Sequence, residues 1–128
     1  MIYVDSSILL SRAFAEEVTP PDAFWALPLT SSQLLLYEVW VRVHAQPTRL
    51  SHREDIERLL DHVELIGLSD DALDRALHPL PLPLRTLDAP HLATTHFLRR
   101  HGQEITLASY DHRLLAAAEA LGIEPAPL

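Results

Sequence analysis

Four acidic residues stand at positions from which their side chains could share a divalent cation. They are Asp5, Glu38, Asp88 and Asp111. Carboxylates that converge in one cleft repel one another, and each raises the pKa of the others unless a cation binds there. The chain has no cysteine, and hard oxygen ligands without thiolates favour Mg²⁺ or Mn²⁺ over zinc. Such a cation could activate water for the hydrolysis of a phosphate ester.

Three of the four acids also have a purely structural explanation. Asp88 and Asp111 stand where helices are expected to begin, and an aspartate there can cap a helix. Glu38 can pair with Arg42 one helical turn later, although its neighbours on the same face are apolar. Asp5 ends an apolar run and has no expected capping role. The joint placement of all four acids therefore favours a shared site over separate structural explanations.

The elements that would position the four acids can be read from the apolar pattern. Apolar runs predict strands at 1–4, 27–30, 63–68 and 104–109, and a last short strand from Ile123. Spacing and capping residues predict the helices between them. The first half of the chain should have a helix after Ser6 and Ser7, a short one after Pro20 and Pro21, one over 33–45 capped by Ser31 or Ser32 and ended by Pro47, and one opened by a Ser51 and Glu54 capping box. The second half should have a helix capped by Ser69 or Asp70, one capped by Thr86 and ended by Gly102, and one over 113–121 capped by Asp111.

Strands that alternate with helices predict an α/β fold. We expect one domain, residues 1–128, with a mostly parallel central sheet of about five strands and helices on both faces. In such sheets, ligands bind beyond the carboxyl ends of the strands. Asp5 and Asp111 follow strands, and Asp88 lies in the first turn of a helix that should begin at this edge. Glu38 lies about two turns into the helix after the second strand.

Several other chemistries are excluded by what the sequence lacks. Without cysteine there is no thiolate nucleophile, and without lysine there is no Schiff-base chemistry. The three glycines form neither a Walker loop nor a dinucleotide fingerprint, and no G-x-S-x-G segment exists. A phosphorelay receiver domain would share the sheet and the aspartates, but its active site uses a lysine. No apolar run of membrane-spanning length and no secretory signal pattern is present, so we expect a soluble, cytoplasmic protein.

Four segments carry a family resemblance through their order and spacing. The first is the apolar run that ends in Asp5-Ser6-Ser7, and the second is Ser31-Ser32 leading to Glu38. The third, over 84–93, reads LRTLDAPHLA and is the most specific; the fourth, over 109–114, reads SYDHRL. Together they resemble the PIN-domain ribonucleases, particularly the VapC toxins of bacterial toxin–antitoxin pairs. The resemblance covers nearly the whole chain and implies a PIN-like fold.

The resemblance implies roles for individual residues. The four acids would bind one or two Mg²⁺ or Mn²⁺ ions and position the water that attacks an RNA phosphodiester. Ser6 and Ser109 would be supporting hydroxyls, and Ser109 stands where many relatives have threonine. Pro90 is a less usual residue in the third segment. His91, one turn after Asp88, could touch a ligand, although a lone helical histidine is more often an ordinary half-buried residue.

The resemblance also implies partners. Toxins of this type are homodimers held in check by a small antitoxin that packs on an apolar groove, which Trp25, Tyr37 and Trp40 could line. The implied substrate is RNA, for which a formal charge of −8 is unfavourable unless a bound cation offsets it locally. The arginines available for phosphate contacts are Arg42, Arg49, Arg85, Arg99, Arg100 and Arg113.

Two alternatives use the same fold. The same acids could serve a DNA nuclease or another metal phosphohydrolase that acts on small phosphate esters. A non-catalytic domain could instead use the fold only to bind a partner, although the presence of all four acids counts against this.

Overall fold

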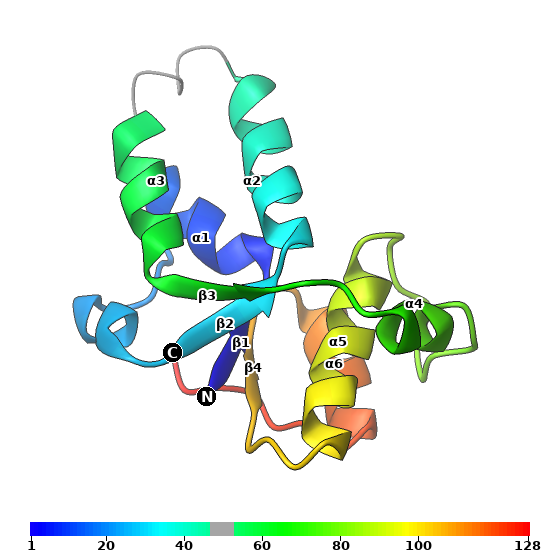
Figure 1. Ribbon diagram of the computed structural model, residues 1–128. Coiled ribbons are helices and arrows are strands. Elements are labelled where there is room, and N and C mark those ends of the chain that lie inside the picture. The colour runs from blue at the N-terminus through cyan, green and yellow to red at the C-terminus, as the bar shows by residue number, and fades with distance from the viewer. Residues whose placement is uncertain (47–52) are drawn as a thin grey trace.

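A four-stranded parallel sheet forms the centre of the molecule (Figure 1). The computed structural model describes residues 1–46 and 53–128. The strands are β1 (Ile2–Val4), β2 (Leu29–Ser32), β3 (Val63–Ile66) and β4 (Thr106–Ala108), in the order β3-β2-β1-β4. Because every pair is parallel, all four strands end at the same edge of the sheet.

The expected fifth strand is reduced to a single bridge between Leu107 and Pro125. Leu107 donates its N–H to the Glu124 carbonyl at 3.0 Å, and its own carbonyl accepts from Ala126 at 2.8 Å. Pro125 and Pro127 have no N–H to donate, so a regular ladder cannot extend along this tail. The prediction of about five strands was therefore one too many.

The second strand was predicted at 27–30 but spans Leu29–Ser32, two residues later. Ser31 and Ser32 belong to β2, where Ser31 pairs with Leu65 of β3. Their polarity is compatible with burial because Ser31 Oγ donates to the Val4 carbonyl at 2.7 Å. Ser32 still serves the next helix, since its Oγ accepts the N–H of Leu34 at 3.2 Å. The third strand ends at Ile66 rather than at residue 68.

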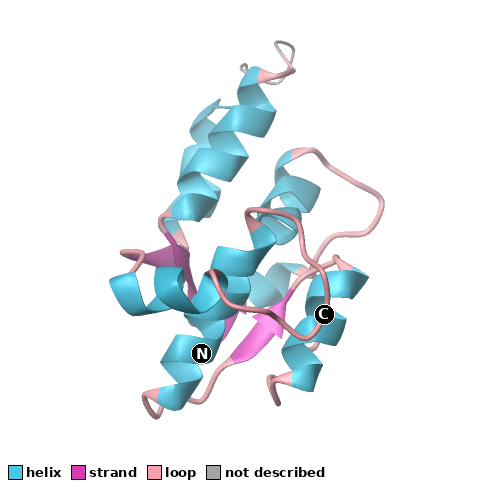
Figure 2. Ribbon diagram, turned by 90° about the vertical axis from the view of Figure 1, so that its right-hand side faces the viewer, coloured by secondary structure: helices cyan, strands magenta, loops and turns pink. Residues whose placement is uncertain are grey.

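Helices cover both faces of the sheet, as Figure 2 shows from the side. On one face α2 (Leu34–His44) and α3 (Arg53–Asp61) both lie against α1 (Ser6–Ala13), and the short 3-10 helix η1 (Asp22–Ala26) adds Phe24 and Trp25 to the same core. On the other face lie α5 (Asp88–Arg100) and α6 (His112–Ala120), with α4 (Asp70–Ala76) packed on α5.

Residues of β1 face the two layers alternately. Val4 belongs to the core beneath α1 and α2, whereas Tyr3 belongs to the core beneath α5 and α6. Both side chains are fully buried, as expected for a central strand of a parallel sheet. The α/β prediction with helices on both faces is therefore confirmed. In the described ranges, no helix combines the length and apolar character needed to cross a membrane.

The predicted helix caps were partly correct. Asp111 caps α6, but α5 begins at Asp88 without help from Thr86. The Arg85 carbonyl accepts the N–H groups of Asp88 and Ala89 at 3.1 and 3.3 Å, so it takes the donors that the Thr86 hydroxyl was expected to satisfy. The residues Pro47 and Ser51, used to predict a helix end and a capping box, lie outside the described part of the chain.

Candidate functional site

An acidic pocket lies at the carboxyl edge of the sheet, beyond β1 and β4. It has a volume of about 170 Å³. Its walls include Asp5, Asp88 and Asp111, together with Ser6, Ser7, Leu10, Glu16, Arg42, Arg85 and Tyr110. Glu38 is joined to the pocket through Ser6, whose hydroxyl donates to Glu38 Oε2 at 3.1 Å. The structure thus brings all four acids to one region.

Asp5 is the most enclosed of the four acids, with 4% of its surface exposed. Its Oδ1 accepts the N–H of Ser7 at 3.1 Å and the Ser7 hydroxyl at 2.5 Å. Its Oδ2 accepts the Ser109 hydroxyl at 2.5 Å. Burial raises the pKa of Asp5, and Asp88 adds repulsion, while the two serine hydroxyls act in the opposite direction.

The expectation that Asp5 has no capping role was wrong. The carboxylate does cap a helix, because it accepts the N–H of Ser7 in the first turn of α1. The sequence places Ser6 and Ser7 directly after it, which is the start of a helix. Capping uses only one of its oxygens, however, and does not account for a carboxylate that is almost completely buried.

Glu38 extends from the middle of α2 into a partly buried position with 11% of its side chain exposed. Its Oε2 accepts from Ser6, and its Oε1 forms a short contact with His91 Nε2 of α5. Within the described residues it makes no ion pair with Arg42, so that structural explanation for Glu38 does not hold. His91 is itself completely buried rather than half-buried.

Asp88 and Asp111 are both held by Arg85, at the open side of the pocket. Arg85 Nη2 lies 2.9 Å from Asp111 Oδ2, and its Nε lies 3.3 Å from Asp88 Oδ2. Burial and the repulsion of Asp111 raise the pKa of Asp88. Burial alone would also raise the pKa of Asp111, but Arg85 and the α6 N–H groups outweigh it, so the pKa is lowered. Asp111 thus combines its capping role with a place in the pocket.

The chemistry of these side chains fits a hard divalent cation. All the acidic ligands are oxygen donors. Burial first, and then the repulsion of a neighbouring carboxylate, raise the pKa of Asp5 and of Asp88, and a bound cation would oppose both effects. Across residues 1–46 and 53–128, however, no three carboxylate or imidazole groups already converge on one point. Asp88 and Asp111 are turned toward Arg85 instead, so a cation would have to compete with the guanidinium for them.

Sequence reasoning did not anticipate the contacts that three residues make in this region. Ser7 donates to Asp5 and accepts the N–H of Tyr110 at 2.9 Å, which ties the start of α1 to the segment after β4. Arg85 stands three residues before Asp88, a spacing that could have suggested the pair. Tyr3 supports His91 from β1, and nothing in the sequence connects two residues that lie 88 positions apart.

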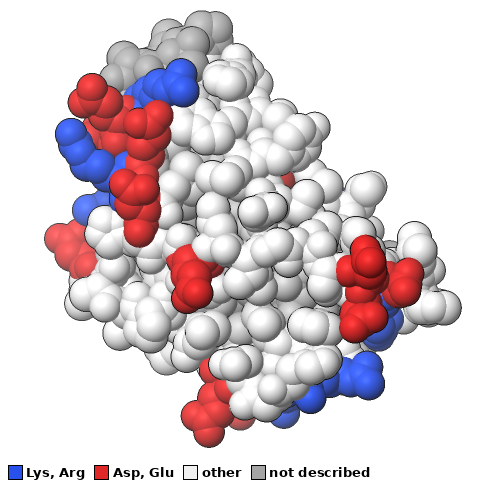
Figure 3. All heavy atoms as spheres, viewed as in Figure 1, with Lys and Arg blue, Asp and Glu red and all other residues white. Residues whose placement is uncertain are grey.

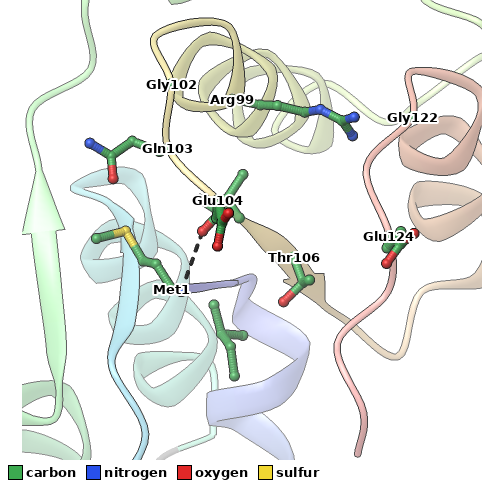
Figure 4. A pocket seen from close by; sticks show the side chains of 10 residues that line it. Met1, Arg99, Gly102, Gln103, Glu104, Thr106, Gly122 and Glu124 are labelled. Atoms are coloured by element: carbon green, nitrogen blue, oxygen red, sulfur yellow. Dashed lines mark hydrogen bonds between the residues drawn. The ribbon is translucent and has the colours of Figure 1, made fainter.

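Of the arginines considered for phosphate contacts, Arg42 and Arg85 line the acidic pocket. Arg99 instead lines a cavity of about 550 Å³ with Met1, Thr106 and Gly122, at the amino ends of β1 and β4 (Figure 4). That cavity is at the opposite end of the sheet from the acids. Arg100 lines a third cavity, between α4 and α5. Arg49 lies outside the described residues.

Solved structures support the fold. The crystal structure of PAE2754 from Pyrobaculum aerophilum superposes with a TM-score of 0.62 at 14% identity, covering 94% of this chain and 90% of that one. A toxin-antitoxin complex from Klebsiella pneumoniae contains a chain that matches with a TM-score of 0.58 at 20% identity, covering 91% of each chain. These identities are low, so the two matches establish the architecture alone.

Curated sequences establish the family. No family model matches the chain. Ribonuclease VapC46 of Mycobacterium tuberculosis is 36% identical over 128 residues, which cover 95% of this chain and 93% of the relative. Ribonuclease VapC47, from another strain of that species, is 31% identical over 133 residues with the same coverage. Similarity of this extent along nearly the full length of both relatives places the chain in the VapC ribonuclease family.

Proposed function

We propose that this chain is a metal-dependent endoribonuclease and the toxin of a toxin–antitoxin pair, acting as one nuclease domain over residues 1–128. The observation that carries the proposal is the gathering of Asp5, Asp88 and Asp111 around one pocket, with Glu38 tied to it through Ser6. The ribonuclease relatives extend over nearly the whole chain and support the same activity.

The four acids would hold one or two Mg²⁺ or Mn²⁺ ions. When bound, such an ion neutralises phosphate charge and lowers the pKa of a coordinated water. The chain's own contribution is to keep the ligands in place. Ser7 and Ser109 fix Asp5 from two sides, and Ser6 fixes one oxygen of Glu38. Arg42 and Arg85 at the pocket wall would contact the RNA phosphates.

The distribution of charge supports a local rather than a general grip on RNA. On the face seen in Figure 3, charged side chains gather over α3, over α4 and along the lower edge, with a mostly uncharged area between them. The arginines of α3 are already paired with acids, as in the contacts of Arg53 with Glu57 and of Arg58 with Asp55. RNA binding is therefore expected to depend on the acidic pocket and its few arginines.

An antitoxin and a second copy of the chain are the proposed protein partners, in the cytoplasm. The Klebsiella pneumoniae structure, a toxin-antitoxin complex, supports the first. Of the three aromatic residues expected in an antitoxin groove, Trp25 is buried in the core and is unavailable. Tyr37 is 61% exposed on α2, near the exposed Val41, so this helix remains the candidate surface.

The test is RNA cleavage with Mg²⁺ or Mn²⁺, with a chelator, and with Asp5→Asn or Asp88→Asn. We expect the chelator to abolish cleavage and each substitution to lower kcat by about 10²-fold or more, because each removes a charged metal ligand. Glu119→Gln, an exposed acid on α6, is the matched control and should cleave like the wild type. Cleavage that survives both chelator and substitution would refute the proposal.

The same assay separates the rival activities. Single-stranded DNA and a chromogenic phosphate ester are offered beside RNA under identical metal conditions. Preference for DNA or for the small ester would replace the ribonuclease proposal with a different metal phosphohydrolase. Absence of hydrolysis on all three substrates, with an intact fold, would favour a partner-binding domain.

A further inference from the structure

We propose that His91, itself held by Tyr3, is a positioning residue that fixes the orientation of Glu38 in the nuclease site. This inference rests on the proposed function, because it concerns a side chain of the same site. Tyr3 and His91 form a buried pair, and neither is among the four acids that would bind the metal. The proposal assigns this pair a role in the site.

The pair forms a continuous path from the backbone of β2 to the acid of α2. The N–H of Ser32 lies 3.2 Å from Tyr3 Oη, and Tyr3 Oη lies 2.6 Å from His91 Nδ1. The other ring nitrogen, Nε2, contacts Glu38 Oε1. Tyr3 and His91 are completely inaccessible to solvent, and their rings meet edge to face at 71°. Water therefore cannot replace either partner in this path.

The last hydrogen bond of the path has a fixed direction. A carboxylate oxygen can only accept, so His91 Nε2, which contacts Glu38 Oε1, is the donor. At the other end, the N–H of Ser32 donates to the oxygen of Tyr3, which lies beside His91 Nδ1. Tyr3 therefore holds the His91 ring in place, and the ring directs its Nε2–H at Glu38.

Glu38 is consequently restrained at both oxygens by donors from two different elements. Ser6 of α1 donates to Oε2, and His91 of α5 donates to Oε1. A carboxylate has about four acceptor positions, so each oxygen can still bind a cation. Partners that orient a metal ligand in this way commonly change metal affinity by 10- to 100-fold when they are removed. A merely structural pair would have no need to end on a partly exposed acid.

The experiment measures Mn²⁺ affinity by calorimetry in the full chain, together with Tm, kcat and KM for RNA. His91→Leu removes the donor to Glu38 and should weaken Mn²⁺ binding by about 10- to 100-fold. Tyr3→Phe should cause a smaller loss, because the His91 ring remains but loses its hydrogen-bond partner at Nδ1. His91→Gln should recover part of the affinity, since an amide can accept from Tyr3 and donate to Glu38.

The matched control is Thr95→Val. Thr95 is buried on α5 one turn after His91, and its hydroxyl donates only to the His91 carbonyl at 2.8 Å. Its loss should lower Tm while leaving Mn²⁺ affinity unchanged. If the His91 and Tyr3 variants behaved in the same way, with lower Tm and wild-type Mn²⁺ affinity, the positioning role would be refuted.

A second measurement does not depend on the stability of variants. Nitrogen-15 NMR of histidine in the metal-free wild type should show a proton on Nε2 of His91, the nitrogen that contacts Glu38. A His91 ring without a proton on Nε2 would overturn the inference. The proposed function fails separately if the wild type neither binds Mn²⁺ nor cleaves RNA, and the inference then falls with it. If Glu38→Gln loses Mn²⁺ and a folded His91→Leu does not, only this inference fails.

Discussion

The acidic pocket has two sides that hold their carboxylates in different ways. On the buried side, Asp5 and Glu38 accept hydrogen bonds from buried side chains that are themselves fixed, including Ser109 and His91. On the open side, Asp88 and Asp111 share one cation, Arg85, whose side chain is 80% exposed. The difference indicates that the buried side is preorganised, whereas the open side is occupied by a charge that can be exchanged.

This contrast explains how a cluster of acids can exist before any metal binds. Neutral donors stabilise the ionised form of Asp5 without adding a positive charge that would later compete with a metal ion. Arg85 neutralises part of the charge at the mouth, where water lowers the strength of an ion pair and makes it easy to break. The guanidinium could then move from the carboxylates to a phosphate.

On the buried side, Ser109→Ala is expected to have the largest effect, a loss of folding stability. It leaves one oxygen of the buried Asp5 without its 2.5 Å donor and also removes the acceptor of the Asp111 N–H. Loss of a hydrogen bond to a charged, buried group costs about 1.5–3 kcal/mol, which urea unfolding should detect. Ser109→Thr keeps the hydroxyl and should stay close to wild type. A cost below that of Arg85→Gln would contradict the division into two sides.

Arg85→Gln should have smaller effects, and they should act in opposite directions on metal and on RNA. Removal of the competing cation should tighten Mn²⁺ binding by up to about fivefold, since exposed ion pairs contribute about 0.2–1 kcal/mol. The same substitution should raise KM for RNA, because a phosphate contact is lost. Titration calorimetry and steady-state kinetics measure the two quantities, with Arg58→Gln as a control on an exposed, acid-paired arginine outside the pocket lining. Weaker Mn²⁺ binding would show that Arg85 supports the ligands instead of competing for them.

The smallest expected effect concerns the two acids of the open side. Their contributions to folding stability should depend on pH in opposite ways. The pKa of Asp88 is raised in the fold, so its contribution to stability is present below its unfolded pKa and is lost as pH rises through the folded value. The pKa of Asp111 is lowered, so its contribution is present above the unfolded pKa and is lost as pH falls through the folded value.

These opposite signs can be measured on metal-free protein. Across the acid range around the ordinary carboxyl pKa of about 4, the unfolding free energy of Asp88→Asn relative to wild type should increase with pH. That of Asp111→Asn relative to wild type should decrease with pH, while asparagine preserves the helix cap. Slopes of the same sign for both variants would mean that Arg85 does not distinguish the two acids.

The sequence predicted the parts of this molecule that depend on local pattern. Apolar runs that stop at an acid, as at Asp5, indicated both the strands and the edge at which the acids lie. Ser32 shows where local pattern fails, because the pairing of β2 with β3 extended the strand into polar residues. The partners of Glu38 were also beyond reach, since His91 meets it across the interior from a helix 53 residues later.

The tail after α6 restricts how this sheet can associate with another chain. Residues 124–126 occupy the outer side of β4 around Leu107, and Pro125 and Pro127 present no N–H groups of their own. A strand from another molecule would therefore find neither a free stretch of β4 nor a donor-bearing edge on the tail. Assembly by edge-to-edge sheet extension is blocked on this side, which leaves helical surfaces for any second copy that approaches here.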